Sequence, residues 1–121
     1  MEIVILENSE QISCRLVDLI SENNFNIKFH QVHTKAGLEL ISDCKPDVVL
    51  LDLKFACDKS LELLKQFKAS NDKVVFIILY SRIDGQTLEK CKKLGVDYVL
   101  DKYDDFEKIP GIIRDIQLKN K

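Results

Sequence analysis

The sequence predicts a doubly wound α/β domain, in which five parallel strands form one sheet and five helices cover its two faces. Apolar strand-like runs alternate with amphipathic segments along all 121 residues, and strict alternation is typical of parallel strands joined by right-handed crossovers. One run, Val48–Leu51, is apolar throughout, which indicates a strand covered on both faces. A chain of this length matches the commonest domain size. We therefore expect residues 1–121 to form a single domain.

The expected strands are short runs rich in Val, Ile and Phe. They are Ile3–Leu6, Ile27–Val32, Asp47–Leu51, Val74–Tyr80 and Asp97–Leu100. Apolar residues at helical spacing follow each strand and predict helices that face the core. These residues are Ile12, Leu16, Leu19 and Ile20, then Leu38 and Ile41, then Leu61, Leu64 and Phe67, then Leu88, Cys91 and Leu94, and finally Ile109, Ile112, Ile113 and Ile116.

Residues at the segment boundaries agree with this pattern. Thr34 can cap the short second helix, and Pro46 bars its continuation. Gly95 suits the position just past a helix end. Pro110 is tolerated only in the first turn of the last helix.

Composition excludes several classes of function. The net charge of -2 provides no polybasic surface for nucleic acid or for anionic lipid. Met1 is followed at once by the strand-like EIVIL without a basic leader, and no apolar run approaches the length of a membrane span. We expect a cytoplasmic protein that binds neither nucleic acid nor membrane.

Familiar motifs for metal, nucleotide and acyl-transfer chemistry are missing from the sequence. Glycines form no GxGxxG loop, no GxSxG elbow is present, and His30 and His33 fall in or beside the second strand. The chain is therefore not expected to be an enzyme. Cysteines form no CxxC pair and have no histidine at metal-ligand spacing, which favours reduced thiols in the core. They are Cys14, Cys44, Cys57 and Cys91.

Polar residues stand at the ends of three expected strands. They are Glu7 and Asn8 after the first, Asp52 after the third, and Asp101 and Lys102 after the fifth. Carboxyl ends of parallel strands frame a crevice at the switch in strand order. If the first, third and fifth strands are neighbours, Glu7 and Asp52 face one another across it, with Lys102 on its rim. Two close carboxylates repel, so a hard divalent cation or an ammonium group must compensate, and Mg²⁺ prefers such oxygen-rich, partly hydrated sites.

Each of these residues also has a simpler interpretation. Asp52 can merely cap the turn that follows it. Glu7 can be an acid in the first turn of a helix, where the helix dipole favours it. Lys102 can be a solvated surface lysine. Their coincidence at three strand ends favours a common site.

The same stretches resemble the response-regulator receiver domain of two-component signalling over essentially the whole chain. VILEN is similar to the strand that carries the acidic pair, PDVVLLDL to the strand of the phosphorylated aspartate, and LGVDYVLDK to the approach to the lysine of that family. The ending DKYDDFEKIP is similar to that of stand-alone receivers. The resemblance implies a flavodoxin-like, CheY-like fold. It also implies that Asp52 takes a phosphoryl group from a phosphohistidine, with Mg²⁺ at Glu7 and Asp52 and with Lys102 on the phosphoryl oxygens.

Several residues depart from that family's pattern around the site. Asn8 stands where a second acid usually ligates the metal. Its amide oxygen still offers a ligand, but with one charge fewer, so we expect weak Mg²⁺ binding. Ala56 and Ser60 replace the usual proline and glycine after the phosphoacceptor. Tyr103 follows Lys102 in place of a proline, so the cis peptide common in the family is not implied.

The positions of the family's conformational switch also differ. Tyr80 occupies the position of the small hydroxyl residue, with Ser81 next to it, and Val99 replaces the aromatic residue of the fifth strand. Tyr98 points to the opposite face by strand alternation. Tyr80 is then either the mobile element itself, with Val99 leaving room for its ring, or a fixed plug, and the sequence leaves both open.

Our interpretation is a stand-alone receiver that is phosphorylated on Asp52 and signals through a partner protein. Its partners would be a sensor histidine kinase or phosphotransfer protein and a downstream effector, and homodimer formation is left open. The alternative is a pseudo-receiver, an interaction module that keeps the fold and acts without phosphate. Asn8, Ala56 and Tyr80 favour that alternative, whereas the joint presence of the acidic pair and the lysine opposes it.

Overall fold

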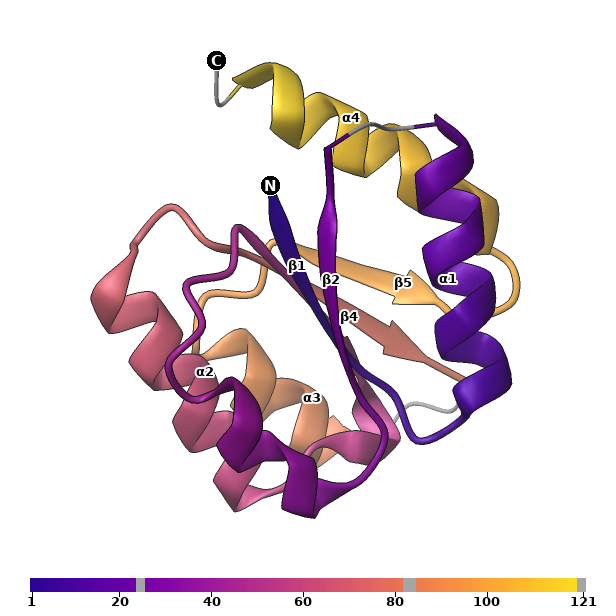
Figure 1. Ribbon diagram of the computed structural model, residues 1–121. Helices are drawn as coiled ribbons and strands as arrows, with labels where there is room; N and C mark the ends of the chain where they lie inside the picture. Colours follow the sequence, from indigo (N-terminus) through magenta and orange to yellow (C-terminus); the bar gives the residue numbers. More distant parts are fainter. Residues whose placement is uncertain (24–25, 82–84, 120–121) are drawn as a thin grey trace.

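Five parallel strands form one sheet in the order β2-β1-β3-β4-β5 (Figure 1). The computed structural model describes residues 1–23, 26–81 and 85–119. Within them the strands are β1 (Glu2–Leu6), β2 (Lys28–Val32), β3 (Val48–Asp52), β4 (Val75–Tyr80) and β5 (Tyr98–Asp101). The predicted fold class and all five predicted strands are confirmed, with small differences at the strand ends.

Helices cover both faces of the sheet. They are α1 (Glu10–Asn23), α2 (Asp58–Ser70), α3 (Gly85–Lys92) and α4 (Ile109–Lys119), with the 3₁₀ segments η1 (Lys35–Ile41), η2 (Leu53–Phe55) and η3 (Phe106–Lys108). Figure 1 shows α1 and α4 together on one face, and α2 and α3 on the other with the segment after β2. The sheet therefore forms the middle layer of three.

The second predicted helix is present, as a 3₁₀ helix rather than an α-helix. The segment around Leu38 and Ile41 folds as the 3₁₀ segment η1, and both residues are buried. Thr34 is its N-cap residue, as predicted, but its side chain makes no capping hydrogen bond. A Cβ on Gly37 would lie 3.1 Å from Val32 Cγ1. This close approach explains a glycine in a short segment pressed against β2.

Strand β3 lies at the centre of the core. Val49 and Leu51 pack on the face covered by α2, whereas Val48 and Leu50 pack on the face covered by α1 and α4. Burial of each Val or Leu contributes about 1.5–3 kcal/mol. The burial of these apolar residues offsets the several kcal/mol that the buried carboxylate of Asp52 costs.

Two other boundary residues behave as predicted. Gly95 lies past the end of α3 at φ +87°, a left-handed conformation in which a Cβ would be strained. Pro110 is the second residue of α4, where its missing N–H costs little. In the part of the chain that the structure describes, every helix is too short or too polar to span a lipid bilayer.

Only one cysteine fits the predicted core environment. Cys91 is fully buried, but Cys44 and Cys57 are half-buried and Cys14 is exposed. All four are free thiols. The expectation of core thiols was wrong for Cys14, because that residue lies on the solvent side of the amphipathic α1.

Candidate functional site

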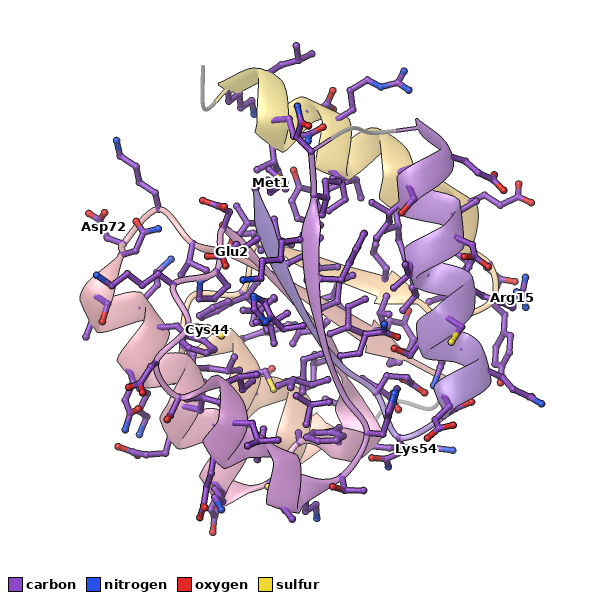
Figure 2. The ribbon with its side chains drawn as sticks, in the orientation of Figure 1. Met1, Glu2, Arg15, Cys44, Lys54 and Asp72 are labelled. Carbon is purple, nitrogen blue, oxygen red and sulfur yellow. The ribbon has the colours of Figure 1, made fainter. Side chains whose placement is uncertain are left out.

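The carboxylates of Glu7 and Asp52 meet at the carboxyl end of the sheet. Strands β1 and β3 are neighbours, and their register pairs Leu6 with Leu51. The next residues, Glu7 and Asp52, therefore lie side by side at the ends of these strands. Both are buried, with exposed fractions of 1% and 2%. Figure 2 shows Lys54, two residues after Asp52, at the end of the sheet away from Glu2, where β1 begins.

Lys102 joins these two acids. Its Nζ donates to Glu7 Oε1 at 2.9 Å and lies 3.2 Å from Asp52 Oδ2. One condition of the prediction is not met, and one expectation about this lysine was wrong. Strand β5 is not a neighbour of β3, because β4 lies between them. Lys102 is also not on a rim: it is 6% exposed, because its long side chain reaches over the end of β4 toward the acids.

The main chain fixes where Lys102 starts. Its N–H donates to the carbonyl of Tyr80 at 2.7 Å, one residue beyond the β4–β5 pairing of Tyr80 with Asp101. Asp101 in turn accepts bonds from the N–H groups of Tyr103 and Asp104. This tight turn after β5 holds the lysine at the site. Every peptide bond in the described chain is trans, as expected for Tyr103.

The site carries two acids for one lysine. Burial raises the pKa of Glu7; the hydrogen bond from Lys102 opposes this, and the charge of Asp52 adds to it. Burial alone would lower the pKa of Lys102, but the bond to Glu7 and the charge of Asp52 outweigh it, so the pKa is raised. Lys102 thus stays charged beside an acid that is hard to ionise.

Two oxygens of the site lack a partner. Glu7 Oε2 and Asp52 Oδ1 are buried and accept no hydrogen bond from any described residue. Unsatisfied buried oxygens are rare and call for a specific explanation. A hard cation would satisfy both and would neutralise the remaining negative charge. Oxygen donors of this kind fit Mg²⁺.

The third expected ligand, Asn8, is exposed next to Glu7. No group of three or more His, Cys, Asp or Glu side chains within the described ranges is placed to hold a metal. This agrees with an amide at the third position, because the site then has only two acids. The expected donor set of two carboxylates and one amide oxygen stays a prediction.

The simpler interpretations of these residues do not match the geometry. Asp52 precedes η2, but its side chain makes no capping hydrogen bond. Glu7 is not in a helix, because α1 begins at Glu10. Lys102 is buried rather than solvated.

The switch candidates lie on the expected faces. Tyr80 and Val99 both pack against the core on the α2 side, whereas Tyr98 packs on the other side. Val99 pairs with Ile78 in the β4–β5 ladder. Tyr80 and Ser81 are half-buried. The ring of Tyr80 and the small side chain of Val99 thus share one side of the sheet near the site.

The loop after Asp52 contains contacts that sequence reasoning missed. Ser60 Oγ accepts from Cys57 N–H at 2.8 Å, and Cys57 Sγ accepts from Ser60 N–H at 3.5 Å. This is a capping box at the start of α2. The serine three residues after a possible cap was the available signal, but cysteine is not among the usual N-cap residues.

Two residues beside Glu7 were also missed as parts of the site. The N–H of Ser9 donates to Glu7 Oε1 at 3.3 Å. His33 Nδ1 lies 3.1 Å from the main-chain oxygen of Glu7. Their positions in the sequence give no sign of these contacts, because both depend on how the loops after β1 and β2 turn.

Comparison with known proteins identifies relatives of the chain. Transcriptional regulatory protein MalR of Bacillus subtilis is 25% identical over 100 residues, which are 82% of this chain and 42% of that protein. Sporulation initiation phosphotransferase F of the same species is 23% identical over 94 residues, or 78% of this chain and 75% of that protein. The chain thus matches about two fifths of the length of MalR.

Solved structures show the same fold. The signal receiver domain of a DNA-binding response regulator from Colwellia psychrerythraea superposes with a TM-score of 0.77 at 20% identity, covering 100% of this chain and 99% of that one. A DNA-binding response regulator of the LuxR family from Staphylococcus aureus gives 0.74 at 22% identity, covering 95% and 97%. Residues 3–114 match the response regulator receiver domain family. Since this match includes most of the sequence, the chain belongs to the family of receiver domains of two-component response regulators.

Proposed function

We propose that Asp52 accepts a phosphoryl group from a phosphohistidine, and that the phosphorylated chain signals by binding an effector protein. One observation carries the proposal. Lys102 contacts both buried carboxylates, while one oxygen of each, Glu7 Oε2 and Asp52 Oδ1, has no partner among the described residues. Phosphoryl transfer to a carboxylate requires positive charge around the transferring group. The lysine supplies such charge, and the two oxygens without a partner can bind a cation that supplies more.

The transfer is a single displacement at phosphorus. A carboxylate oxygen of Asp52 attacks, a P–O bond forms, and the product is an acyl phosphate. The P–N bond of the phosphohistidine breaks, and the histidine nitrogen keeps the electron pair and takes up a proton. Lys102 pairs with the negative oxygens of the transferring group. Mg²⁺, when bound at Glu7, Asp52 and the amide of Asn8, supplies further charge neutralisation.

The proposed partners follow from this chemistry. The donor is a histidine kinase or a phosphotransfer protein, and the chain receives the group rather than acting as an enzyme in its own right. We propose that the reaction takes place in the cytoplasm and that the phosphorylated chain acts on an effector protein.

Beryllofluoride tests the proposed acceptor because it mimics a phosphoryl group on a carboxylate. With Mg²⁺ present, wild type should give a bound ¹⁹F signal. Asp52→Ala should give none while retaining its far-ultraviolet circular dichroism. Asp72→Ala is a matched control, because Asp72 is an exposed acid in the loop before β4, away from the acidic pair, and this variant should still bind. A bound signal in Asp52→Ala would refute the assignment.

The pseudo-receiver is the alternative, and it rests on departures of the sequence from the family's pattern at Asn8, Ala56 and Tyr80. Asn8 is exposed and lacks the charge of a second metal-binding acid, and Tyr80 fills the position of the small switch residue. A pseudo-receiver would bind its effector equally well with and without beryllofluoride. The buried contacts of Lys102 to both acids oppose this candidate, since a module without phosphate has no need of them.

A further inference from the structure

We propose that His33 is a positioning residue for the acidic site. Its imidazole holds the main-chain carbonyl of Glu7 and so orients both Glu7 and Asn8. The inference rests on the proposed function for its role toward Mg²⁺, but the contact itself is a property of the metal-free fold.

The contact assigns a donor role to Nδ1 of the ring. His33 Nδ1 lies 3.1 Å from Glu7 O. A carbonyl oxygen can only accept a hydrogen bond, so Nδ1 carries the proton and donates it. The ring is half-buried at the end of β2, so surrounding atoms limit its movement and the bond is partly shielded from water.

The histidine extends the sheet where the main chain stops pairing. The ladder between β1 and β2 ends with Leu6 opposite Val32, and Glu7 N–H still donates to Val32 O at 3.1 Å. In a parallel ladder the carbonyl of Glu7 would next accept a main-chain N–H from the partner strand. The chain instead turns after Val32 toward η1, and the imidazole supplies a donor to that carbonyl.

This bond controls more than one residue. The carbonyl of Glu7 and the nitrogen of Asn8 belong to one planar peptide group. Holding that oxygen therefore limits the ψ angle of Glu7 and the φ angle of Asn8 together. The side chain of Glu7 leaves the main chain just before this peptide group, and that of Asn8 leaves it just after. The Glu7 carboxylate then meets Lys102 and the N–H of Ser9 in one fixed arrangement.

Three variants separate positioning from simple loss of a side chain. His33→Leu removes the donor. His33→Asn keeps one, because the amide Nδ2 lies nearly where Nδ1 was. His30→Leu is the matched control, since His30 lies within β2, three residues before His33, and contacts Glu2 Oε1 at 3.2 Å, at the other end of β1.

Two readouts are needed, one of them without metal. The first is hydrogen exchange of the Ser9 amide, followed by NMR in metal-free protein. The second is Mg²⁺ affinity from a titration. His33→Leu should speed Ser9 exchange and weaken Mg²⁺ binding by roughly three- to ten-fold, the range expected for one hydrogen bond. His33→Asn should restore most of both, and His30→Leu should change neither.

The outcomes decide the two claims separately. Unchanged Ser9 exchange in His33→Leu, or a His33→Asn variant as impaired as His33→Leu, would overturn the role of His33. A wild type that binds neither Mg²⁺ nor beryllofluoride would refute the proposed function instead. The metal-free exchange would still decide whether His33 holds the peptide.

Discussion

At the scale of single residues, the site depends on an acid that is buried against its preference for water. Glu7 is 1% exposed, and burial raises its pKa above the ordinary value of 4.5, with Lys102 opposing the shift and Asp52 adding to it. The folded state therefore binds the proton of Glu7 more tightly than the unfolded state does. Keeping Glu7 ionised at neutral pH therefore lowers the stability of the folded state.

This cost predicts a pH dependence. Because the folded pKa of Glu7 lies above 4.5, its contribution to the free energy of unfolding falls as the pH rises from 4.5 through the folded pKa. Wild type should lose stability relative to Glu7→Gln over that window in metal-free buffer, as measured by urea denaturation at a series of pH values. A difference between the two proteins that is constant with pH would contradict the burial of an ionised Glu7.

A second prediction at this scale concerns Asn8. Hard cations are held largely by ligand charge, and Asn8 contributes an amide where an acid would add one negative charge. Asn8→Asp should therefore bind Mg²⁺ more tightly than wild type does in a calorimetric titration. Asn26→Asp adds the same charge away from the site and serves as the control. Equal affinities for wild type and Asn8→Asp would place residue 8 outside the coordination sphere.

At the scale of elements, a capping box forms at the start of α2, where the resemblance led us to expect a proline and a glycine. Ser60 is fully buried, and its hydroxyl oxygen accepts from Cys57 N–H at 2.8 Å. Sulfur is the weaker acceptor of the pair, at 3.5 Å from Ser60 N. The capping box thus sets the position where helix α2 begins, six residues after Asp52.

The capping box gives a stability prediction. Ser60→Ala should lower the free energy of unfolding by about 1 kcal/mol, because the partly buried N–H of Cys57 loses its partner. Cys57→Ser should leave stability unchanged or raise it, because a hydroxyl is the better acceptor. Denaturant midpoints measure both. The capping role of Ser60 is wrong if Ser60→Ala unfolds at the same midpoint as wild type.

Much of the fold was predictable at this scale, since apolar runs and helical spacing report directly which residues are buried. Strand ends were less so: β3 was expected at Asp47–Leu51 and spans Val48–Asp52, because pairing with neighbours decides where a strand stops. The close approach of η1 to Val32 is a tertiary contact, which no local pattern reveals.

Side-chain positions in the site were predictable only in part. The acids Glu7 and Asp52 could be placed because both directly follow apolar strands. The burial of Lys102 could not be predicted. Hydrophobic periodicity does not reveal strand order, so it does not show that β4 lies between β5 and β3. The contact of His33 with Glu7 arises from two loops and has no sequence signature.

At the scale of the whole molecule, the sheet connects the acidic site to the surface around β4 and β5. Lys102 is tied to Tyr80 by a main-chain hydrogen bond of 2.7 Å, and Tyr80 shares its side of the sheet with Val99. A phosphoryl group that draws Lys102 toward itself would therefore act on the strand end that carries Tyr80. Such a ligand shifts a conformational population only by its different affinity for the two states.

We predict that Tyr80 is the mobile element of this response. Beryllofluoride should shift the amide resonances of β4 and β5 in wild type at least as much as in Tyr80→Thr. Ser81→Ala tests the neighbouring hydroxyl, and it should leave the wild-type response in place. If Tyr80→Thr enlarges the response while wild type barely changes, Tyr80 is a fixed plug.

The most direct test of the account is the intact mass of the chain after incubation with Mg²⁺ and acetyl phosphate. Acetyl phosphate supplies a phosphoryl group without a kinase, so the result depends only on the site. Wild type should gain the mass of one phosphoryl group, and Asp52→Ala should gain none. Unchanged wild-type mass, or equal labelling of Asp52→Ala, would contradict the claim that Asp52 is the phosphoacceptor.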